Sequence, residues 1–355
     1  MYMIQTPRVT MRSIQFMPRI VVLFSVAALF FQSADIVRAE ALRTQVIQLN
    51  AGWNSVYLEV DPTNADPDEL FAGLPIDIVA APVASGLQAQ FSSNPGVSGL
   101  DLEGWGCWYE KEDGQSFLDT LFSIHGTQGY LIHCQEATAL SVTGAVRHSD
   151  LKWRPGQFNF VGFSVMTQGA PTFAQFFQGS AAHQHNRIYR MVSGSWRQIE
   201  DPSAVSMRSG EAFWVFCDGP SRFQGPLRAV PNSVEGMKLA TSTGLLSIYN
   251  DTTQPVALTL DHIATSDTPS PLSIIVQTVH SESPQIRSME APKPAGDWTL
   301  ALPAIEAGRS QGIPLQARLA DMTLPEQSSL LRVTTDIGTE IWISVDCLRK
   351  DLVGE

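Results

Sequence analysis

Charged side chains are scarce in this sequence, and acidic residues outnumber basic ones. Charged residues make up 16% of the 355 residues, and 23 Lys and Arg stand against 35 Asp and Glu, so the formal net charge is −12. About 25% charged residues is usual in a globular protein. Nucleic acids and anionic membrane surfaces are bound through basic patches. We therefore expect no nucleic acid and no lipid surface among the partners.

The sequence also lacks an apolar run of the roughly 20 residues that a membrane-spanning helix needs. The nearest approach, residues 20–31, follows three arginines and precedes polar residues and Val37-Arg38-Ala39. A basic flank, a short apolar stretch and small or apolar residues before a cleavage point are typical of a secretory leader. A membrane anchor is the alternative, and the run is too short for it. We predict export, to the periplasm, the cell surface or the medium, with cleavage after Ala39 and no membrane span in the mature chain.

Cysteine is rare as well. The four cysteines are Cys107, Cys134, Cys217 and Cys347. An exported protein can form disulfides, but four cysteines in a chain of this length do not make a disulfide framework. Three pairings are possible, and Cys107 with Cys134 is the pair that lies inside one repeated segment described below. Buried free thiols on strands are the equal alternative, and in both cases we assign Cys107 and Cys134 a structural role.

The motifs that carry common chemistry are absent. Residues 162–166 lack the second glycine of a nucleophile elbow, and the sequence has no phosphate loop, no Rossmann glycines and no Cys-x-x-Cys pair. His183 and His185 have the spacing of two ligands on one strand face, but no third ligand is evident. The acidic run 61–68 lacks the glycine and the distal glutamate of a calcium loop, so helix capping is favoured. We expect no metal, no cofactor and no catalytic residue.

What the chain does contain is a repeat, because segments 45–146 and 152–230 carry three anchors in the same order. The first anchor is Asn54, which matches Asn159. The second is Gly106-Cys107-Trp108 with Glu112-Asp113, which matches Gly194-Ser195-Trp196 with Glu200-Asp201. The third is Tyr130–Cys134, which matches Phe213–Cys217. Three matches in order indicate an internal duplication, with shorter loops in the second copy.

The first anchor of each copy opens an alternating strand. The apolar rows are Asn54, Val56, Leu58 and Val60 in the first copy, and Asn159, Val161, Phe163 and Val165 in the second. Alternation with β-branched residues predicts a half-buried strand. We expect each asparagine to hold backbone groups at the turn before its strand, with a ligand contact as the alternative. Asp66-Pro67 and Pro171-Thr172 then predict a short helix after each strand.

The residues Gly52-Trp53-Asn54 with their alternating strand, the mid-module Gly-x-Trp and Ala212-Phe213-Trp214 resemble a module of exported bacterial proteins. In that mostly uncharacterised family the module recurs in tandem and precedes immunoglobulin-like or lectin-like domains. The resemblance covers about residues 45–230. The second copy departs from it, with Gln157-Phe158 in place of Gly-Trp. The resemblance implies export and architecture, and it carries over no active-site residue.

The last third of the chain follows a polar stretch with Pro and Gly, residues 228–236. About seven short strands are expected, including a final hairpin of residues 331–335 with 341–345, and residues 280–296 are expected to form a long exposed loop. Short strands at this spacing are typical of a β-sandwich. The pattern resembles immunoglobulin-like domains of bacterial surface proteins in topology.

Aromatic residues and carboxylates gather in the repeats. Glu110, Glu112 and Asp113 lie near Trp105 and Trp108 in the first copy, and Glu200 and Asp201 lie near Trp196 in the second. Paired carboxylates could serve as the acid and base of a sugar hydrolase, and a solvated hairpin tip is the favoured alternative. Exposed in a row, Trp105, Trp108 and Trp196 would form a sugar-stacking platform or a protein-binding patch, whereas in a small β module most tryptophans belong to the core.

The sequence therefore predicts a mainly β protein with four parts: a signal peptide (1–39), β module 1 (40–150), β module 2 (151–232) and an immunoglobulin-like β-sandwich (237–350). The function that we expect is a non-enzymatic, exported structural or interaction component at the cell surface or outside the cell. The first alternative is a carbohydrate-binding protein that uses the module aromatics, and the second is a glycan hydrolase without a recognisable motif. Expected partners are a glycan or another surface protein.

The repeat makes a quantitative prediction about the two strands. Leu58→Ala or Phe163→Ala should lower the free energy of unfolding by about 2–5 kcal/mol through cavity formation. On the same pattern Glu59 and Ser164 should face outward or toward the module rim, so Glu59→Ala should cost under about 0.5 kcal/mol as a surface change. Urea denaturation of the three variants measures both values. Unrelated topologies for the two segments, or either apolar row in solvent, would contradict the repeat.

Overall fold

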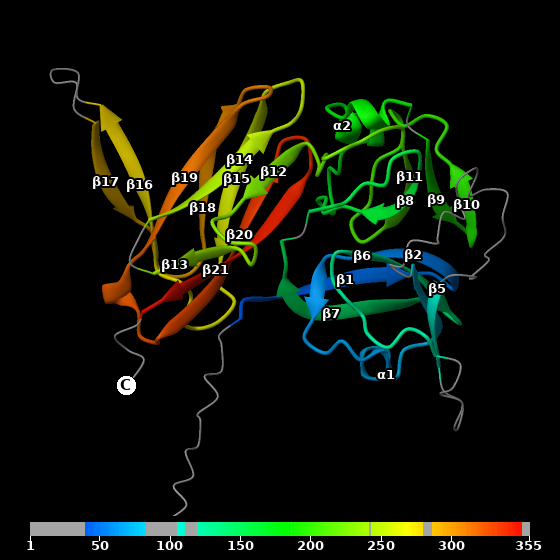
Figure 1. Cartoon of the computed structure of the whole chain (residues 1–355). Coiled ribbons are helices and arrows are strands. Elements are labelled where there is room, and N and C mark those ends of the chain that lie inside the picture. Colours follow the sequence, from blue (N-terminus) through cyan, green and yellow to red (C-terminus); the bar gives the residue numbers. More distant parts are fainter. Residues whose placement is uncertain are drawn as a thin grey trace, which may run out of the picture. The chain divides into compact units, whose positions relative to one another are not determined.

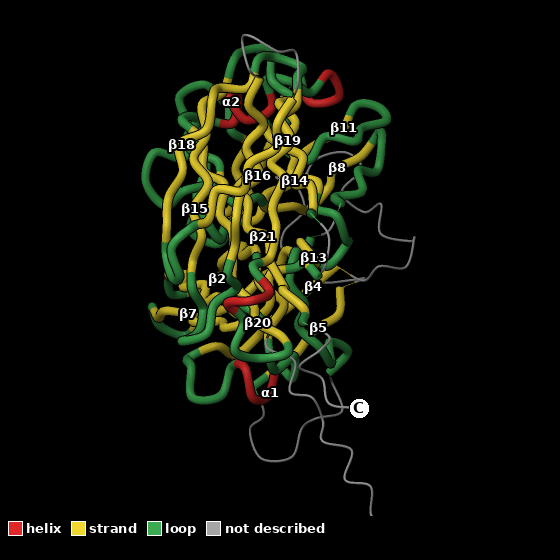
Figure 2. Tube along the Cα trace, turned by 90° about the vertical axis from the view of Figure 1, so that its left-hand side faces the viewer, coloured by secondary structure: helices red, strands yellow, loops and turns green. Residues whose placement is uncertain are grey.

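The computed structural model describes residues 40–82, 105–110, 119–148, 150–185, 187–240, 243–279 and 286–349. The predicted signal peptide lies outside these residues. Within them the protein is mainly β, and Figure 2 shows only a few short helices among the strands. The predicted fold class is confirmed. No helix in the described ranges is long and apolar enough to cross a membrane.

The first module consists of two antiparallel sheets around one core. The four-stranded sheet has the order β2 (Gly52–Leu58), β6 (Gln128–Cys134), β4 (Ile76–Pro82) and β5 (Trp105–Tyr109). The three-stranded sheet has the order β1 (Leu42–Leu49), β7 (Thr138–Val146) and β3 (Val60–Pro62). The short helix α1 (Pro67–Leu70) begins at Asp66, whose side chain accepts a hydrogen bond from the backbone of Asp68. The acidic run thus caps a helix, as predicted.

The second module repeats the four-stranded sheet of the first. Its elements are β8 (Gln157–Gly162), α2 (Phe173–Phe177), the 3-10 helix η3 (Ala181–His183), β9 (Ile188–Val192), β10 (Ser195–Gln198) and β11 (Ala212–Cys217). The spatial order β8-β11-β9-β10 corresponds strand by strand to β2-β6-β4-β5. In both modules a short helix separates the first two of these strands along the chain (Figure 1). The predicted duplication is therefore present in the topology.

The register of the repeated strands agrees as well. Asn54 lies opposite Ile132, two residues before Cys134, and Asn159 lies opposite Val215, two residues before Cys217. Asn54 Oδ1 accepts from the backbone N of Asn50 at 2.9 Å, and Asn159 Oδ1 accepts from that of Arg154 at 2.8 Å. Each asparagine also donates to backbone carbonyls of the same turn. The two side chains close equivalent turns.

One of the three anchors is displaced by three residues. Trp108 lies opposite Val79, whereas Trp196 lies opposite Met191. Ile199 instead bonds to the backbone of Ile188, the counterpart of Val79, so Ile199 occupies the position of Trp108. Trp196 therefore corresponds to Trp105, and the predicted match of Trp108 with Trp196 is wrong.

The hairpin turns explain this error. Ser193 and Gly194 both have positive φ angles, 49° and 75°, as a two-residue hairpin turn between antiparallel strands requires. Gly194 is thus a turn residue between β9 and β10. Gly106 lies inside strand β5 and has no such role. The Gly-x-Trp triplets look alike in the sequence but serve different purposes.

The C-terminal part is a sandwich of two five-stranded sheets around a separate core. One sheet has the order β12 (Leu227–Val230), β14 (Gly244–Asn250), β19 (Ser310–Ala317), β16 (Leu272–Val279), β17 (Ile286–Pro292). The other has the order β13 (Met237–Leu239), β21 (Glu340–Leu348), β20 (Glu326–Thr335), β15 (Val256–Ile263), β18 (Trp298–Ile305), and the 3-10 helix η4 spans Leu319–Asp321. Figure 1 shows both sheets, with β16 and β17 at one edge.

The sandwich differs from its prediction in two places. Residues 280–296 are not one long loop, because β17 pairs with β16 along residues 286–292. The segment Leu227–Val230, assigned from the sequence to module 2, pairs with β14 as an edge strand of the sandwich. The predicted last hairpin is present, with Val333 opposite Ile341.

Close backbone contacts join the modules and the sandwich. A Cβ on Gly162 of β8 would meet the Tyr57 ring of β2 at 2.2 Å, so only glycine lets these strands approach. Gly338, in the turn between β20 and β21, has φ +86°, and a Cβ at this position would lie 1.9 Å from the carbonyl oxygen of Gly169. Its own carbonyl accepts from the backbone of Met166 at 2.9 Å. The two modules and the sandwich belong to one compact unit, Arg38–Glu355.

The predicted apolar rows are confirmed, but the prediction for Glu59 is wrong. Val56, Leu58, Val60, Val161, Phe163 and Val165 are all buried, and Ser164 is half-buried. Glu59 is buried too, because it lies between β2 and β3, where the chain passes from one sheet to the other. Its carboxylate contacts Arg43 Nη1 at 2.7 Å, and its backbone N donates to Gln45 at 2.8 Å.

The burial of Glu59 reverses the expected cost of its removal. Glu59→Ala should lower the free energy of unfolding by about 1–3 kcal/mol, because Arg43 loses its hydrogen-bonded partner and keeps only Glu340 at 3.7 Å. Exposed Glu200 provides the control, and Glu200→Ala should cost under about 0.5 kcal/mol. Urea denaturation measures both. Combining Glu59→Ala with Arg43→Ala should restore part of the loss, and strictly additive losses would show that the pair is not coupled.

Candidate functional site

The aromatic residues of the repeats form a layer between the two four-stranded sheets. This aromatic layer comprises buried Phe158, Tyr189, Trp196 and Trp214 and half-buried Trp53, Trp105, Tyr109, Phe160 and Phe216. Trp105 lies edge-on to Phe160 at 5.5 Å and to Trp214 at 6.3 Å, so rings of both modules interlock. Trp196 is 6% exposed and packs on the same two rings.

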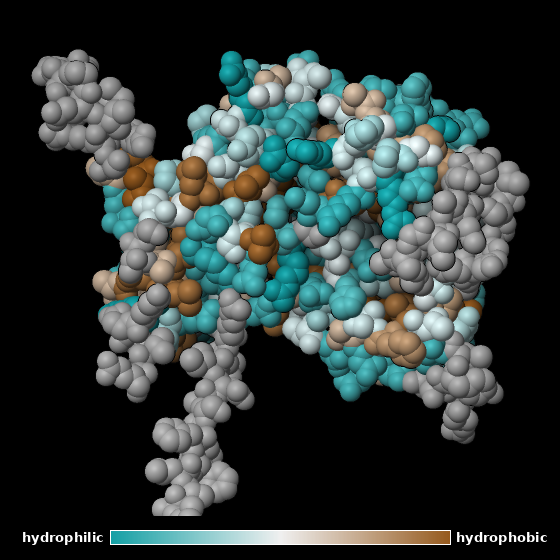
Figure 3. Space-filling model, viewed as in Figure 1, coloured by the Kyte–Doolittle hydropathy of each residue, from teal (hydrophilic) through white to brown (hydrophobic). Residues whose placement is uncertain are grey.

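The three tryptophans considered as a binding platform do not lie in one exposed row. Trp105 and Trp196 pack between the modules, and Trp108 belongs to the core of module 1, where its Nε1 donates to Asp68 at 2.7 Å. On the face shown in Figure 3, hydrophobic residues are scattered in small groups rather than gathered in one patch. The aromatic residues of the repeat serve mainly to pack the sheets.

The four cysteines are free and buried. Cys107 belongs to the layer between the modules, and Cys134 belongs to the core of module 1. Burial raises the pKa of both thiols, that of Cys134 to about 11. Protonated, buried thiols are poor nucleophiles, so they act here as small apolar side chains.

The carboxylates considered for hydrolysis are solvent-exposed where the structure describes them. Glu110, Glu200 and Asp201 are exposed, and Glu112 and Asp113 lie outside the described residues. Hydrogen bonds from Ser203 lower the pKa of Asp201. A general acid needs a raised pKa, so Asp201 does not suit that role.

The two histidines considered as metal ligands do not share a strand face. His183 ends the 3-10 helix η3 and is buried, whereas His185 is exposed and contacts Asp218 at 2.8 Å. Among the described residues no group of three His, Cys, Asp or Glu is placed to hold a metal ion. These histidines therefore offer no metal site in the described structure.

A hydrogen-bonded serine–histidine pair escaped the sequence reasoning. Ser180 Oγ lies 2.6 Å from His183 Nδ1, and both residues are buried. The imidazole packs against Trp153 at 4.1 Å and Phe177 at 5.0 Å, and its Nε2 has no partner. Burial lowers the pKa of His183 to about 4. Such a weak base activates a serine poorly, so the pair is a structural contact.

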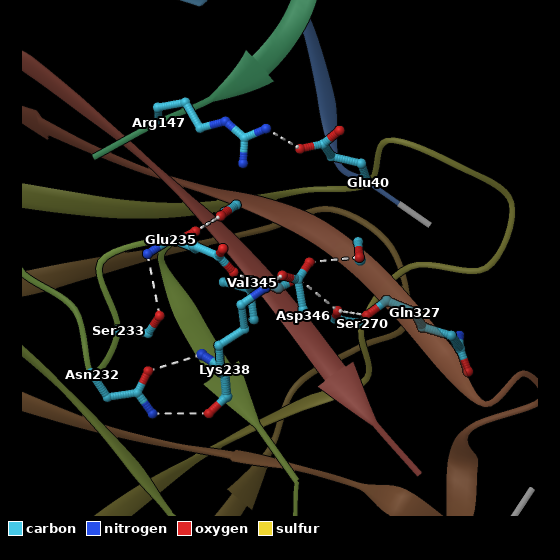
Figure 4. Close-up of polar contacts among 12 residues, drawn as sticks. Glu40, Arg147, Asn232, Ser233, Glu235, Lys238, Ser270, Gln327, Val345 and Asp346 are labelled. Carbon is cyan, nitrogen blue, oxygen red and sulfur yellow. Dashed lines mark hydrogen bonds and ion pairs between the residues drawn. The ribbon is translucent and has the colours of Figure 1, made fainter. Parts of the chain in front are cut away.

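A second polar cluster fastens the parallel strand β13 to β21 (Figure 4). Lys238 forms ion pairs with Asp346 and with Glu235, the latter at 3.2 Å, and the Asn232 side chain bonds to both backbone groups of Lys238 at 2.8 Å. Ser328 Oγ donates to the second oxygen of Asp346 at 2.6 Å. Every charge in this cluster has a partner, which marks it as structural.

The best candidate for a binding site is a cavity of about 480 Å³ where the two modules and the sandwich meet. We call it the junction cavity. Its less exposed part is lined by Arg43, Tyr57 and Glu59 of module 1, Phe160 and Ser164 of module 2, and Glu340 and Trp342 of the sandwich. Its more exposed part includes Arg147, His148, Asp150, Lys152 and Arg228. Small-molecule sites have volumes of about 300–1,000 Å³.

The charges in the inner part of the cavity do not balance. Arg43 contacts Glu59 at 2.7 Å and Glu340 at 3.7 Å, so two carboxylates share one guanidinium. The guanidinium also lies over the Trp342 ring, 4.4 Å from its centroid. Burial raises the pKa of Glu340, because water no longer solvates its charge.

Several neutral polar groups of the cavity lack partners. Tyr57 Oη, Thr127 Oγ1 and Ser164 Oγ make no hydrogen bond with any described residue, and Lys152 has no ion pair there. Sequence reasoning missed this site because its residues come from segments separated by up to about three hundred positions. No local motif connects them.

Comparisons with known proteins found similarity among solved structures, at low sequence identity. No family model matches, and no curated protein matches. Among solved structures, a PapD-like domain of human CEP192 is 10% identical, covers 35% of this chain and 84% of that one, and has a TM-score of 0.20. A β-glucosidase from Listeria innocua is 11% identical, covers 37% of this chain and 18% of that one, and has a TM-score of 0.18. Similarities this low carry no argument about function.

The low pKa of His183 predicts a pH dependence of stability. An unfolded histidine titrates near 6.5, and the folded one near 4, so the unfolded state binds more protons between these values. The stabilisation is complete above pH 6.5 and is lost as the pH falls toward 4. His183→Gln should therefore reduce the loss of unfolding free energy between pH 7 and pH 4.5 by about 2–3 kcal/mol.

Exposed His185 is the control, and His185→Gln should change the pH dependence by less than His183→Gln does, because His185 is not buried. Chemical denaturation at the two pH values measures both variants. An NMR titration of His183 with a midpoint near the ordinary value would contradict the buried, neutral ring.

Proposed function

We propose that this chain is an exported bacterial protein that acts without catalysis, as a structural and interaction component at the cell surface or outside the cell. The basic and apolar pattern of residues 1–39 supports export. The resemblance of residues 45–230 to tandem modules of exported bacterial proteins supports the same assignment.

The observation that carries the proposal is the use of the aromatic residues. The aromatic rings on the two four-stranded sheets pack against one another and so join module 1 to module 2. The sandwich is then fastened to the modules through the backbone contacts of Gly338 and the ion pair between Arg43 and Glu340. Because the large aromatic side chains pack between parts of the same chain, they suit a structural role.

Carbohydrate binding is the second candidate, and the junction cavity favours it. Trp108 and Trp196 are buried, so they cannot form an exposed stacking platform with Trp105. The unpaired hydroxyl groups of the junction cavity offer an alternative place for a sugar. The proposed function thus keeps a glycan or another surface protein as the partner.

Export can be tested by fractionating bacteria that produce the full chain or a chain without residues 1–39. The full chain should leave the cytoplasm and start at Glu40, as read by mass spectrometry of the intact protein. The shortened chain should stay inside. Ala39→Phe should still leave the cytoplasm with its leader attached, because a bulky residue blocks cleavage.

Retention of the full chain in the cytoplasm, with its leader intact, would contradict export. The non-catalytic part of the proposal has a separate test in a broad hydrolase screen of the purified protein. Turnover that Glu112→Ala or Glu200→Ala abolishes would overturn it.

A further inference from the structure

We propose that the junction cavity binds a saccharide of one or two rings that is neutral or carries a protonated amine. The inference rests on the proposed interaction role and names the ligand class for it. It follows from the size, the unpaired hydroxyl groups and the charge of the cavity.

The cavity presents neutral hydroxyl groups that no described residue satisfies. Tyr57 Oη, Thr127 Oγ1 and Ser164 Oγ each can donate one hydrogen bond and accept others. They come from β2, from the turn before β6 and from the residues after β8. A polyhydroxylated ligand could bond to several of them at once, whereas an apolar ligand would leave them unpaired at a cost.

The charge of the inner part selects among polar ligands. Arg43 carries one positive charge, and Glu59 and Glu340 together carry two negative charges when ionised. Glu59 already accepts hydrogen bonds from Arg43 and from Ser209. Glu340 lies 3.7 Å from Arg43, beyond a good hydrogen bond, so its oxygens can accept from a sugar hydroxyl or an ammonium group. A ligand carboxylate in the inner part would lie next to Glu59 and Glu340, whereas the basic Arg147, Lys152 and Arg228 line the more exposed part.

The apolar part of the lining suits the ring faces of a sugar. Phe160 and Trp342 are half-buried, and Val146, Val161 and Phe163 add aliphatic and aromatic surface. A saccharide has hydroxyl groups at its edge and C–H groups on its faces. The apolar lining residues can contact the C–H faces, and the polar lining residues can bond to the hydroxyl groups.

Affinity can be measured by isothermal titration calorimetry on the purified full chain. The probes are glucose, cellobiose, glucosamine, chitobiose and glucuronate. We expect binding of at least one neutral or amino saccharide, and weaker binding of glucuronate, because its carboxylate cannot enter the inner part beside Glu59 and Glu340 without repulsion. Tyr57→Phe removes only the unpaired hydroxyl and keeps the ring against Gly162, so it should weaken binding about tenfold without loss of stability. Tyr189→Phe, in the aromatic layer, is the control and should not change the affinity.

The variant Glu340→Gln distinguishes a neutral saccharide from an amino saccharide as the ligand. If the ligand carries an ammonium group, this variant should lose most of the affinity for glucosamine, and if the ligand is neutral, it should retain binding of glucose or cellobiose within a few fold. Either pattern supports the site. No binding of any saccharide at millimolar concentration, or binding that Tyr57→Phe, Ser164→Ala and Glu340→Gln all leave unchanged, would overturn it. Failure here would leave the export result untouched, so the two proposals fail separately.

Discussion

The structure depends on one constraint: the four-stranded sheet of each module is apolar on both faces. Along β11, Phe213, Val215 and Cys217 point into the core of module 2, while Trp214 and Phe216 point into the aromatic layer. Strand β6 alternates in the same way, with Tyr130 and Ile132 in its own core and Leu131 in the layer. A surface sheet usually exposes one polar face to water. Because these sheets have none, each needs the other as its cover, and a duplicated sheet supplies it.

The junction between modules and sandwich follows from this arrangement. With β2 held close to β8 and β11, Tyr57 N donates to Gly210 O at 2.8 Å and Ser55 Oγ donates to Ala212 O at 2.7 Å. The residues just after β8 then reach the hairpin of β20 and β21, where Val165 bridges to Thr339. Polar groups of all three parts meet at this point. Arg43 compensates the buried Glu59, and a buried charge is tolerated only with such a partner. The junction cavity lies between the surfaces of the two modules and the sandwich, beside these contacts.

The sequence predicted the features that short-range patterns determine. Alternation placed Leu58 and Phe163 in the cores, and the cap signals placed α1 and α2. It failed where a feature depends on the length of a turn or on distant segments. The short turn at Ser193 and Gly194 shifted the tryptophan match by three residues. Glu59 looked exposed because strict alternation ignores the passage from one sheet to another. The junction cavity had no local signal, since β1, β8 and β21 contribute side chains to one place from distant parts of the chain.

The divergence of the two copies has a physical reason in the layer that they share. Equivalent cross-strand rows face each other there: Ser55, Leu131 and Ala80 in the first sheet correspond to Phe160, Trp214 and Tyr189 in the second. One copy thus carries smaller, non-aromatic side chains in the middle of its outer face, and the other carries large rings at the same positions. A Cβ on Gly129 would lie 2.8 Å from the Phe160 ring, so even alanine is too large at that point. Two copies with large rings would overpack the layer, and two with small residues would leave a void, and each destabilises a core. The modules fit because their facing side chains differ in size, with rings on one sheet and smaller side chains on the other.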